Sequence, residues 1–147
     1  MSESNNSLCE AEVTKAVMSA ARLFGFKFNR RNVGMAFGAS GKPVRFGEPG
    51  QLDWYGRGPA GTRCQDRELE LEIKRENFNP TRIYGKEKAR FAKQLANMVE
   101  INRRGGFALW VSCVPTAVIF LRCLIQYEQV RVNIQENGYY EVYTGSD

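Results

Sequence analysis

The sequence predicts a single α/β domain, residues 1–147, in which a central mixed sheet is flanked by helices. Two stretches with apolar residues at helical spacing enclose three strand-like segments, and an almost wholly apolar segment follows the second stretch. The predicted order is therefore αβββαβ, followed by a further helix and a hairpin. With 147 residues, 43% of them hydrophobic, the chain suits one core and leaves little room for a second.

The first helix is predicted by an apolar stripe that stops at Gly25, a residue type common just after the last turn of a helix. A basic, extended run over 26–32 then forms the first strand. The stripe consists of Val13, Ala16, Val17, Ala20 and Phe24.

The glycine-rich segment over 34–50 has little periodicity and is predicted to be a loop or a loose hairpin. Residues 38–43 resemble a phosphate-binding loop in part. However, Ala36 stands where the first glycine of that motif belongs, and Pro43 replaces the hydroxyl residue that would bind magnesium. We therefore do not expect a nucleotide-binding loop here.

The segment Glu68–Lys74 alternates leucine or isoleucine with charged residues, which predicts a half-buried strand. With a period of two, Glu72 and Lys74 point to the same face. If Asp53 ends a neighbouring strand, it brings a second carboxylate to the same place. Two carboxylates and an ammonium suit metal-dependent cleavage of a phosphodiester. The alternative is a solvated strand face on which Glu and Lys merely pair.

The second half of the chain begins with a strong helix over 85–104, which Gly105 and Gly106 end. A buried strand is predicted over 107–114. Pro115 suits the first turn of another helix, which runs to about Gln126. The stripe that faces the sheet in the helix over 85–104 consists of Phe91, Leu95, Met98 and Val99.

The C-terminal segments around 130–134 and 139–143 alternate in polarity and flank Asn137-Gly138. This pattern predicts a hairpin with a type I′ turn, because that turn needs positive φ at both central residues.

Composition excludes several classes of chemistry. Histidine is absent, so neither a Ser-His-Asp triad, a Cys-His pair nor a histidine zinc site can form. The four cysteines lie far apart and are expected to be reduced thiols. Lys and Arg outnumber Asp and Glu by 21 to 16, a net charge of +5 that favours a polyanionic partner.

The apolar segment over 107–125 is about long enough to span a membrane, but Pro115 divides it and Arg122 lies within it. A buried strand followed by a core helix is the better interpretation. The polar residues 1–7 lack the basic and apolar regions of a signal peptide. We therefore expect a cytoplasmic protein without a membrane contact.

Several features of the chain agree in order and spacing with one known family: Glu10 and Gly25, Arg31-Asn32-Val33-Gly34, Arg45-Phe46-Gly47, Gly50-Gln51-Leu52-Asp53, Glu72-Ile73-Lys74, Gln94 and Gly105-Gly106. Taken together, they resemble a stand-alone VRR-NUC domain, a branch of the PD-(D/E)xK nuclease superfamily found in phage and bacterial proteins. The resemblance covers about residues 10–114, and residues 115–147 are accessory to it. Leu52 stands where the superfamily name has Pro, and the interval between Lys74 and Gln94 is longer than usual for the family.

The resemblance implies a restriction-endonuclease-like fold and a metal-dependent DNA endonuclease. Asp53, Glu72, the Ile73 main-chain carbonyl and Glu10 would bind Mg²⁺ or Mn²⁺, with Glu12 the second choice for the helix ligand. Lys74 would orient water or stabilise transition-state charge, and Gln94 would hold the water, the phosphate or the lysine. No organic cofactor is expected.

The resemblance further implies branched DNA as substrate and a homodimer, as in Holliday-junction resolvases. A flap or restriction-like nuclease, or an inactive nucleic-acid-binding module, is the alternative. Trp54, Tyr55 and Tyr84 could stack on unpaired bases, and Trp54 and Tyr55 could instead be core or strand residues. Predicted DNA contacts, each of which could instead be solvated surface, are Arg30, Arg31, Asn32, Lys42, Arg45, Arg75, Arg82, Lys86 and Lys88.

Overall fold

The computed structural model describes residues 7–31, 34–37, 41, 43–46 and 50–145. Its helices and strands follow the predicted order, with a short hairpin inserted after the first strand. In chain order they are α1 (Glu10–Leu23), β1 (Lys27–Arg30), β2 (Gly34–Phe37), β3 (Pro43–Phe46), β4 (Trp54–Arg57), β5 (Leu69–Ile73), α2 (Gly85–Arg103), β6 (Phe107–Val111), α3 (Val114–Gln126), β7 (Gln129–Ile134) and β8 (Tyr140–Gly145).

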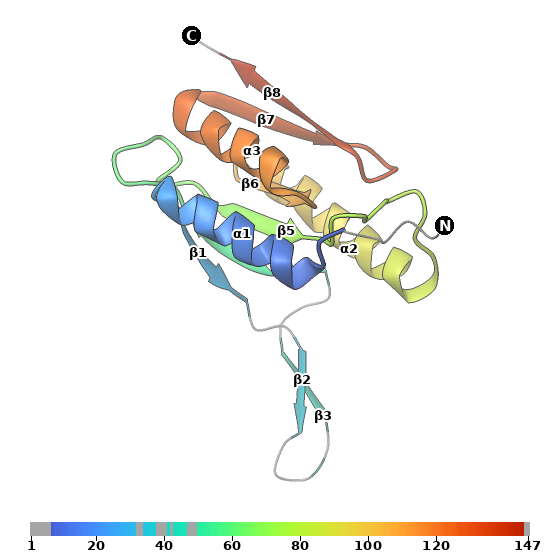
Figure 1. Ribbon diagram of the computed structural model, residues 1–147. Coiled ribbons are helices and arrows are strands. Elements are labelled where there is room, and N and C mark those ends of the chain that lie inside the picture. The colour runs from blue at the N-terminus through green and yellow to red at the C-terminus, as the bar shows by residue number, and fades with distance from the viewer. Residues whose placement is uncertain (1–6, 32–33, 38–40, 42, 47–49, 146–147) are drawn as a thin grey trace.

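The central sheet has four strands in the order β1-β4-β5-β6. The β1–β4 and β4–β5 pairs are antiparallel, whereas β5 and β6 are parallel and are joined through α2. Strands β2 and β3 pair antiparallel, so of the two predicted alternatives for the glycine-rich segment, a loop or a loose hairpin, the hairpin is found. The two strands project away from the central sheet (Figure 1). The predicted mixed sheet flanked by helices is confirmed.

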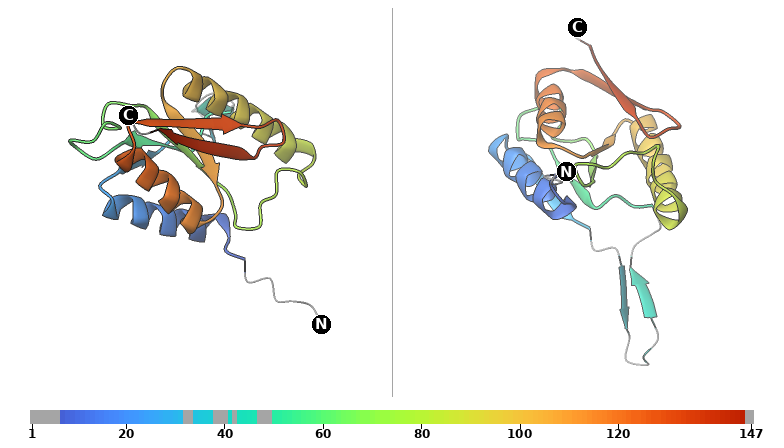
Figure 2. Two further views of the ribbon diagram at one scale, coloured as in Figure 1. Left: turned by 90° about the horizontal axis from the view of Figure 1, so that it is seen from above. Right: turned by 45° about the vertical axis from the view of Figure 1, so that its right-hand side comes forward.

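Two layers of helices cover the two faces of this sheet. Helices α1 and α3 contact each other on one face, and α2 lies on the other (Figure 2). On the first face, Leu69, Leu71 and Ile73 of β5 pack with apolar residues of α1, α3 and β6 in one core cluster. On the second face, Ala108 and Trp110 of β6 pack with residues of α2 in another.

The prediction that β5 is half-buried is wrong. All five of its residues are buried, including Glu70, which is 4% exposed, and Glu72, which is 2% exposed. The alternation of the sequence is real, but α2 covers the face that carries the charged residues. A strand that lies beneath a helix layer on each side, as β5 does, has no face left for solvent.

The C-terminal helix and hairpin complete the core. Ala117, Phe120, Leu121 and Leu124 of α3 are buried against the first face of the sheet, and β7 contacts α2 and β6. The predicted strand over 107–114 is shorter than expected, because α3 begins at Val114.

The predicted type I′ turn is wrong. Gly138 has a φ of 87°, but among the described residues no other residue type has positive φ, so Asn137 does not. Gln135 N–H donates to the Tyr139 carbonyl, and Gly138 N–H donates to the Gln135 carbonyl. The three-residue loop over 136–138 is therefore a turn that ends in a left-handed glycine, another common hairpin connection.

Within the described part of the chain, no helix is both long enough and apolar enough to cross a membrane.

Candidate metal and catalytic site

Strands β4 and β5 bring Asp53 and Glu72 together. Trp54 pairs with Leu71 in the antiparallel register, so Asp53, one residue earlier, lies opposite Glu72. The Asp53 main-chain N–H donates to Glu72 Oε2 at 3.0 Å. Asp53 precedes β4 and does not end a strand as expected, but the predicted meeting of the two carboxylates is found.

Lys74 and Gln94 join the same cluster from β5 and α2. Lys74 Nζ lies 3.4 Å from Glu72 Oε1 and donates to Gln94 Oε1 at 2.8 Å. Gln94 is 5% exposed, so it is not a solvated residue on the surface of α2. The four residues that the sequence singled out, Asp53, Glu72, Lys74 and Gln94, therefore meet at one end of the sheet.

Glu72 is the electrostatic centre of the cluster. Burial raises the pKa of its carboxyl to about 7, and the nearby charge of Asp53 also raises it. The Lys74 ammonium and the Asp53 N–H act in the opposite direction. One ammonium therefore does not offset the cost of burying this carboxylate beside a second one.

Two aromatic rings that the sequence did not single out surround Lys74. Its Nζ lies 5.4 Å from the ring centroid of Phe78 and 5.3 Å from that of Phe91. Phe91 was predicted only as a core residue, and no pattern marked Phe78. The rings stabilise the cation through their π faces and exclude water from one side of the ammonium.

The structure does not bring Glu10 to the other acids. Glu10 is exposed at the first residue of α1, which packs on the face of the sheet opposite to Glu72. Among the described residues, no group of three or more His, Cys, Asp or Glu side chains lies close enough to hold a metal ion. Glu12 has a local role, because its Oε1 accepts the Cys9 N–H in a capping box at the start of the helix.

The remaining donor set is nonetheless suited to a hard cation. Asp53 and Glu72 supply carboxylate oxygens, and the Ile73 main-chain carbonyl lies between Glu72 and Lys74 at the end of β5. Magnesium commonly uses one or two protein carboxylates and completes its octahedron with water and substrate phosphate. The incompletely compensated charge at Glu72 makes an added cation electrostatically favourable.

The predicted DNA contacts divide into four groups. The guanidinium of Arg31 is held by partners within the protein: it pairs with Glu70 and donates to the Leu52 carbonyl at 3.1 Å. Arg75 pairs with Glu87 at 2.9 Å on the surface. Four others are exposed: Arg30, Arg82, Lys86 and Lys88. Asn32, Lys42 and the side chain of Arg45 lie outside what the structure describes.

The three aromatic candidates also differ. Trp54 packs against the first core cluster. Tyr55 is 42% exposed, with the Arg31 guanidinium 4.9 Å from its ring centroid, and Tyr84 is 76% exposed. Tyr84 and Tyr55 thus remain available for stacking, whereas Trp54 belongs mainly to the core.

Comparison of this chain with protein families, with curated proteins and with solved structures found no match.

Proposed function

We propose that this chain is a divalent-metal-dependent DNA endonuclease. The observation that carries the proposal is the meeting of Asp53, Glu72, Lys74 and Gln94, with a buried carboxylate held against an ammonium. The order of helices and strands agrees with the PD-(D/E)xK core that the sequence resembles. A cluster of this kind suits phosphodiester hydrolysis better than acyl transfer, because the chain has no histidine to activate a nucleophile.

Asp53 and Glu72 would hold Mg²⁺ or Mn²⁺, with the Ile73 carbonyl as a further oxygen donor. When bound, the ion would supply Lewis-acid polarisation of the phosphate and lower the pKa of a water molecule. The Asp53 N–H donates to one oxygen of Glu72 and so holds the carboxylate in place before the ion binds. The carboxylate therefore loses less rotational freedom when it binds the ion.

Lys74 would stabilise the negative charge that develops on the phosphate. Gln94 and Glu72 hold its ammonium in position before substrate arrives, so little reorganisation is needed during the reaction. The rings of Phe78 and Phe91 lower the local dielectric around it, which strengthens its interaction with charge.

Branched DNA is the proposed substrate, and a homodimer is the proposed assembly. A four-way junction presents two symmetry-related strands, so its symmetric resolution needs two sites related by a twofold axis. The outer surfaces of α3 and β8 carry exposed Ile119 and Tyr143, which are candidates for the contact between copies. A strict monomer in sedimentation that cuts flaps and leaves junctions intact would favour the flap-nuclease alternative.

A cleavage panel tests the proposal directly. Duplex, flap, splayed-arm and four-way-junction DNA would be incubated with Mg²⁺, with Mn²⁺ and with EDTA. We expect cleavage in both metals and none in EDTA. Absence of cleavage of every substrate in both metals would contradict the proposal.

The Lys74→Ala variant separates catalysis from binding. We expect the turnover number to fall by about two orders of magnitude with little change in DNA affinity, because the lysine acts mainly in the transition state. Lys15→Ala, which removes an exposed lysine of α1, is the matched control. A loss seen only as weaker binding would make Lys74 a phosphate contact.

A further inference from the structure

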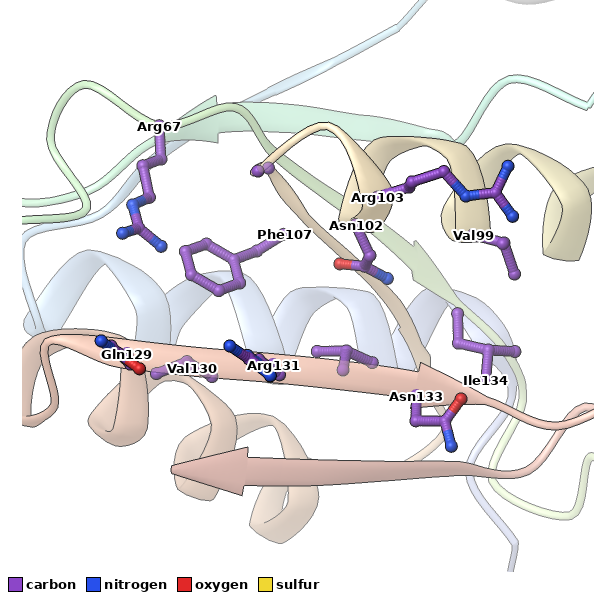
Figure 3. Close-up of a pocket in the computed structure, with 13 residues that line it drawn as sticks. Arg67, Val99, Asn102, Arg103, Phe107, Gln129, Val130, Arg131, Asn133 and Ile134 are labelled. Carbon is purple, nitrogen blue, oxygen red and sulfur yellow. The ribbon is translucent and has the colours of Figure 1, made fainter. Parts of the chain in front are cut away.

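A groove lined by three arginines lies at the other end of the sheet from the candidate metal site. It has a volume of about 560 Å³ and opens between the C-terminal end of α2, the start of β6 and strand β7 (Figure 3). Arg67, which precedes β5, reaches toward Phe107, with Gln129 and Arg131 of β7 across the groove (Figure 3). Arg103 lines it from the last turn of α2.

The lining of this groove is positively charged. It contains Arg67, Arg103 and Arg131, and its lining residues include no Asp or Glu. Within the part of the chain that the structure describes, Arg67 and Arg131 have no ion-pair partner. Arg103 lies 3.8 Å from Glu100, but both side chains are more than half exposed, so this pair contributes little. The protein therefore leaves most of this charge uncompensated.

The groove is also organised for polar contacts. The Arg67 guanidinium lies 5.0 Å from the centroid of the Phe107 ring, which restricts its position. Gln129, Arg131 and Asn133 alternate along β7 and are exposed, so the three side chains share one face of the strand. Planar guanidinium groups beside amide side chains suit phosphate oxygens and sugar hydroxyls.

We infer that this groove is a second nucleic-acid contact that binds the sugar–phosphate backbone of a DNA strand. Arg67 precedes β5, whereas Glu72 lies near its far end, so these two residues of the groove and the candidate metal site are about 16 Å apart along the strand. That length corresponds to about five base pairs of one duplex strand. The inference rests on the proposed DNA substrate, and it adds a contact remote from the reacting phosphate.

DNA binding in EDTA tests the groove without requiring cleavage. The titration would use a fluorescent DNA duplex of about two helical turns with the Arg67→Ala/Arg103→Ala/Arg131→Ala protein. We expect affinity to fall at least about tenfold at low salt. The slope of log K against log salt concentration should fall by about two to three, because each phosphate that the protein neutralises adds about 0.9 to it.

The matched control removes the same charge from surface residues that do not line the groove. It carries Lys15→Ala, Arg22→Ala and Lys27→Ala, three exposed residues of α1 and β1. We expect it to bind within about threefold of the unchanged protein, since distant surface charges are screened. Equal losses in the two triple variants would overturn the inference, because net charge alone would then explain them.

A double variant and a competitor separate strand binding from disturbed packing and from small-ligand binding. The Arg103→Ala/Arg131→Ala protein keeps Arg67 on Phe107, so we expect it to bind DNA more weakly with that packing intact. Unchanged binding by this protein would overturn the inference. A mononucleotide that displaced the duplex at equal concentration would overturn the strand assignment. If the protein cleaved no DNA but its DNA binding still depended on the groove arginines, the proposed nuclease function would be wrong and the inference about the groove would stand.

Discussion

The two faces of strand β5 are equally buried but chemically opposite. Leu69, Leu71 and Ile73 pack against α1 and α3 in an apolar core. Glu70 and Glu72 are covered by α2 and are at most 4% exposed. Burying a carboxylate costs several kcal/mol unless partners compensate it, whereas burying leucine is favourable. The α2 face is therefore maintained at an energetic cost, which directs attention to it as the functional face.

The two glutamates of that face are compensated in different ways. Burial, and to a lesser extent the neighbouring Glu68, raises the pKa of Glu70, and the paired guanidinium of Arg31, which is also held by the Leu52 carbonyl, opposes that rise. Glu72 faces the Lys74 ammonium but also Asp53, and its pKa is raised to about 7. This contrast indicates a structural role for Glu70, whereas Glu72 has the properties of a cation ligand.

The largest expected effect is a loss of cleavage activity, which we expect on substitution of Glu72 but not of Glu70. Asp53→Asn and Glu72→Gln should each reduce Mg²⁺-dependent cleavage by about three orders of magnitude or more, because amides bind hard cations poorly. Glu70→Gln should retain cleavage within about threefold. Cleavage rates with circular dichroism as a folding check would measure this, and DNA binding should persist in all three proteins. Undiminished cleavage by Asp53→Asn would show that the site lies elsewhere.

The apolar face should respond in stability and not in chemistry. Leu71→Ala, at a residue 2% exposed, should lower the free energy of unfolding by roughly 2–5 kcal/mol through lost burial and a cavity. Urea denaturation would measure the loss. Turnover per folded molecule should stay unchanged. A loss of turnover in the folded protein would contradict the assignment of a purely structural role to the apolar face.

The pH dependence of stability should reveal the charge at Glu72. A carboxyl with a raised pKa binds its proton more tightly in the folded state, so its contribution is favourable below its unfolded pKa and is lost as pH rises through its folded pKa. The metal-free protein should lose up to about 3 kcal/mol from this group between about pH 4.5 and pH 7. Glu72→Gln should remove that part of the profile, and identical profiles for the two proteins would contradict the raised pKa.

The smallest effects are expected at the start of α1. Glu10→Gln should change cleavage by less than about threefold, since Glu10 lies on the other side of the sheet from Glu72. Glu12→Gln should also be nearly silent, because glutamine can accept the Cys9 N–H in the same way. A loss of about a hundredfold at Glu10 alone would restore it as a ligand that joins the site on metal binding.

The local sequence determined most of the elements and the core of the candidate site. Helical spacing identified α1 and α2, and Gly25 marked the end of α1 with a φ of 89°. Period-two alternation placed Glu72 and Lys74 on one face of β5, and the structure brings Asp53 and Gln94 to them. The helical spacing and the alternation depend on near neighbours in the chain, which one sequence is sufficient to describe, whereas Asp53 and Gln94 reach the site through the tertiary fold.

Only the tertiary structure decided how those residues are surrounded. It buried Glu72 beneath α2 and paired Arg31 with Glu70. It also separated Glu10 from the two carboxylates and placed Phe78 and Phe91 around Lys74. It also brought Arg67, Arg103 and Arg131 to one groove from three distant segments. The pKa of a carboxyl and the partner of a guanidinium depend on such long-range neighbours, because the polarity and charge within a few ångströms come from residues far away in the chain.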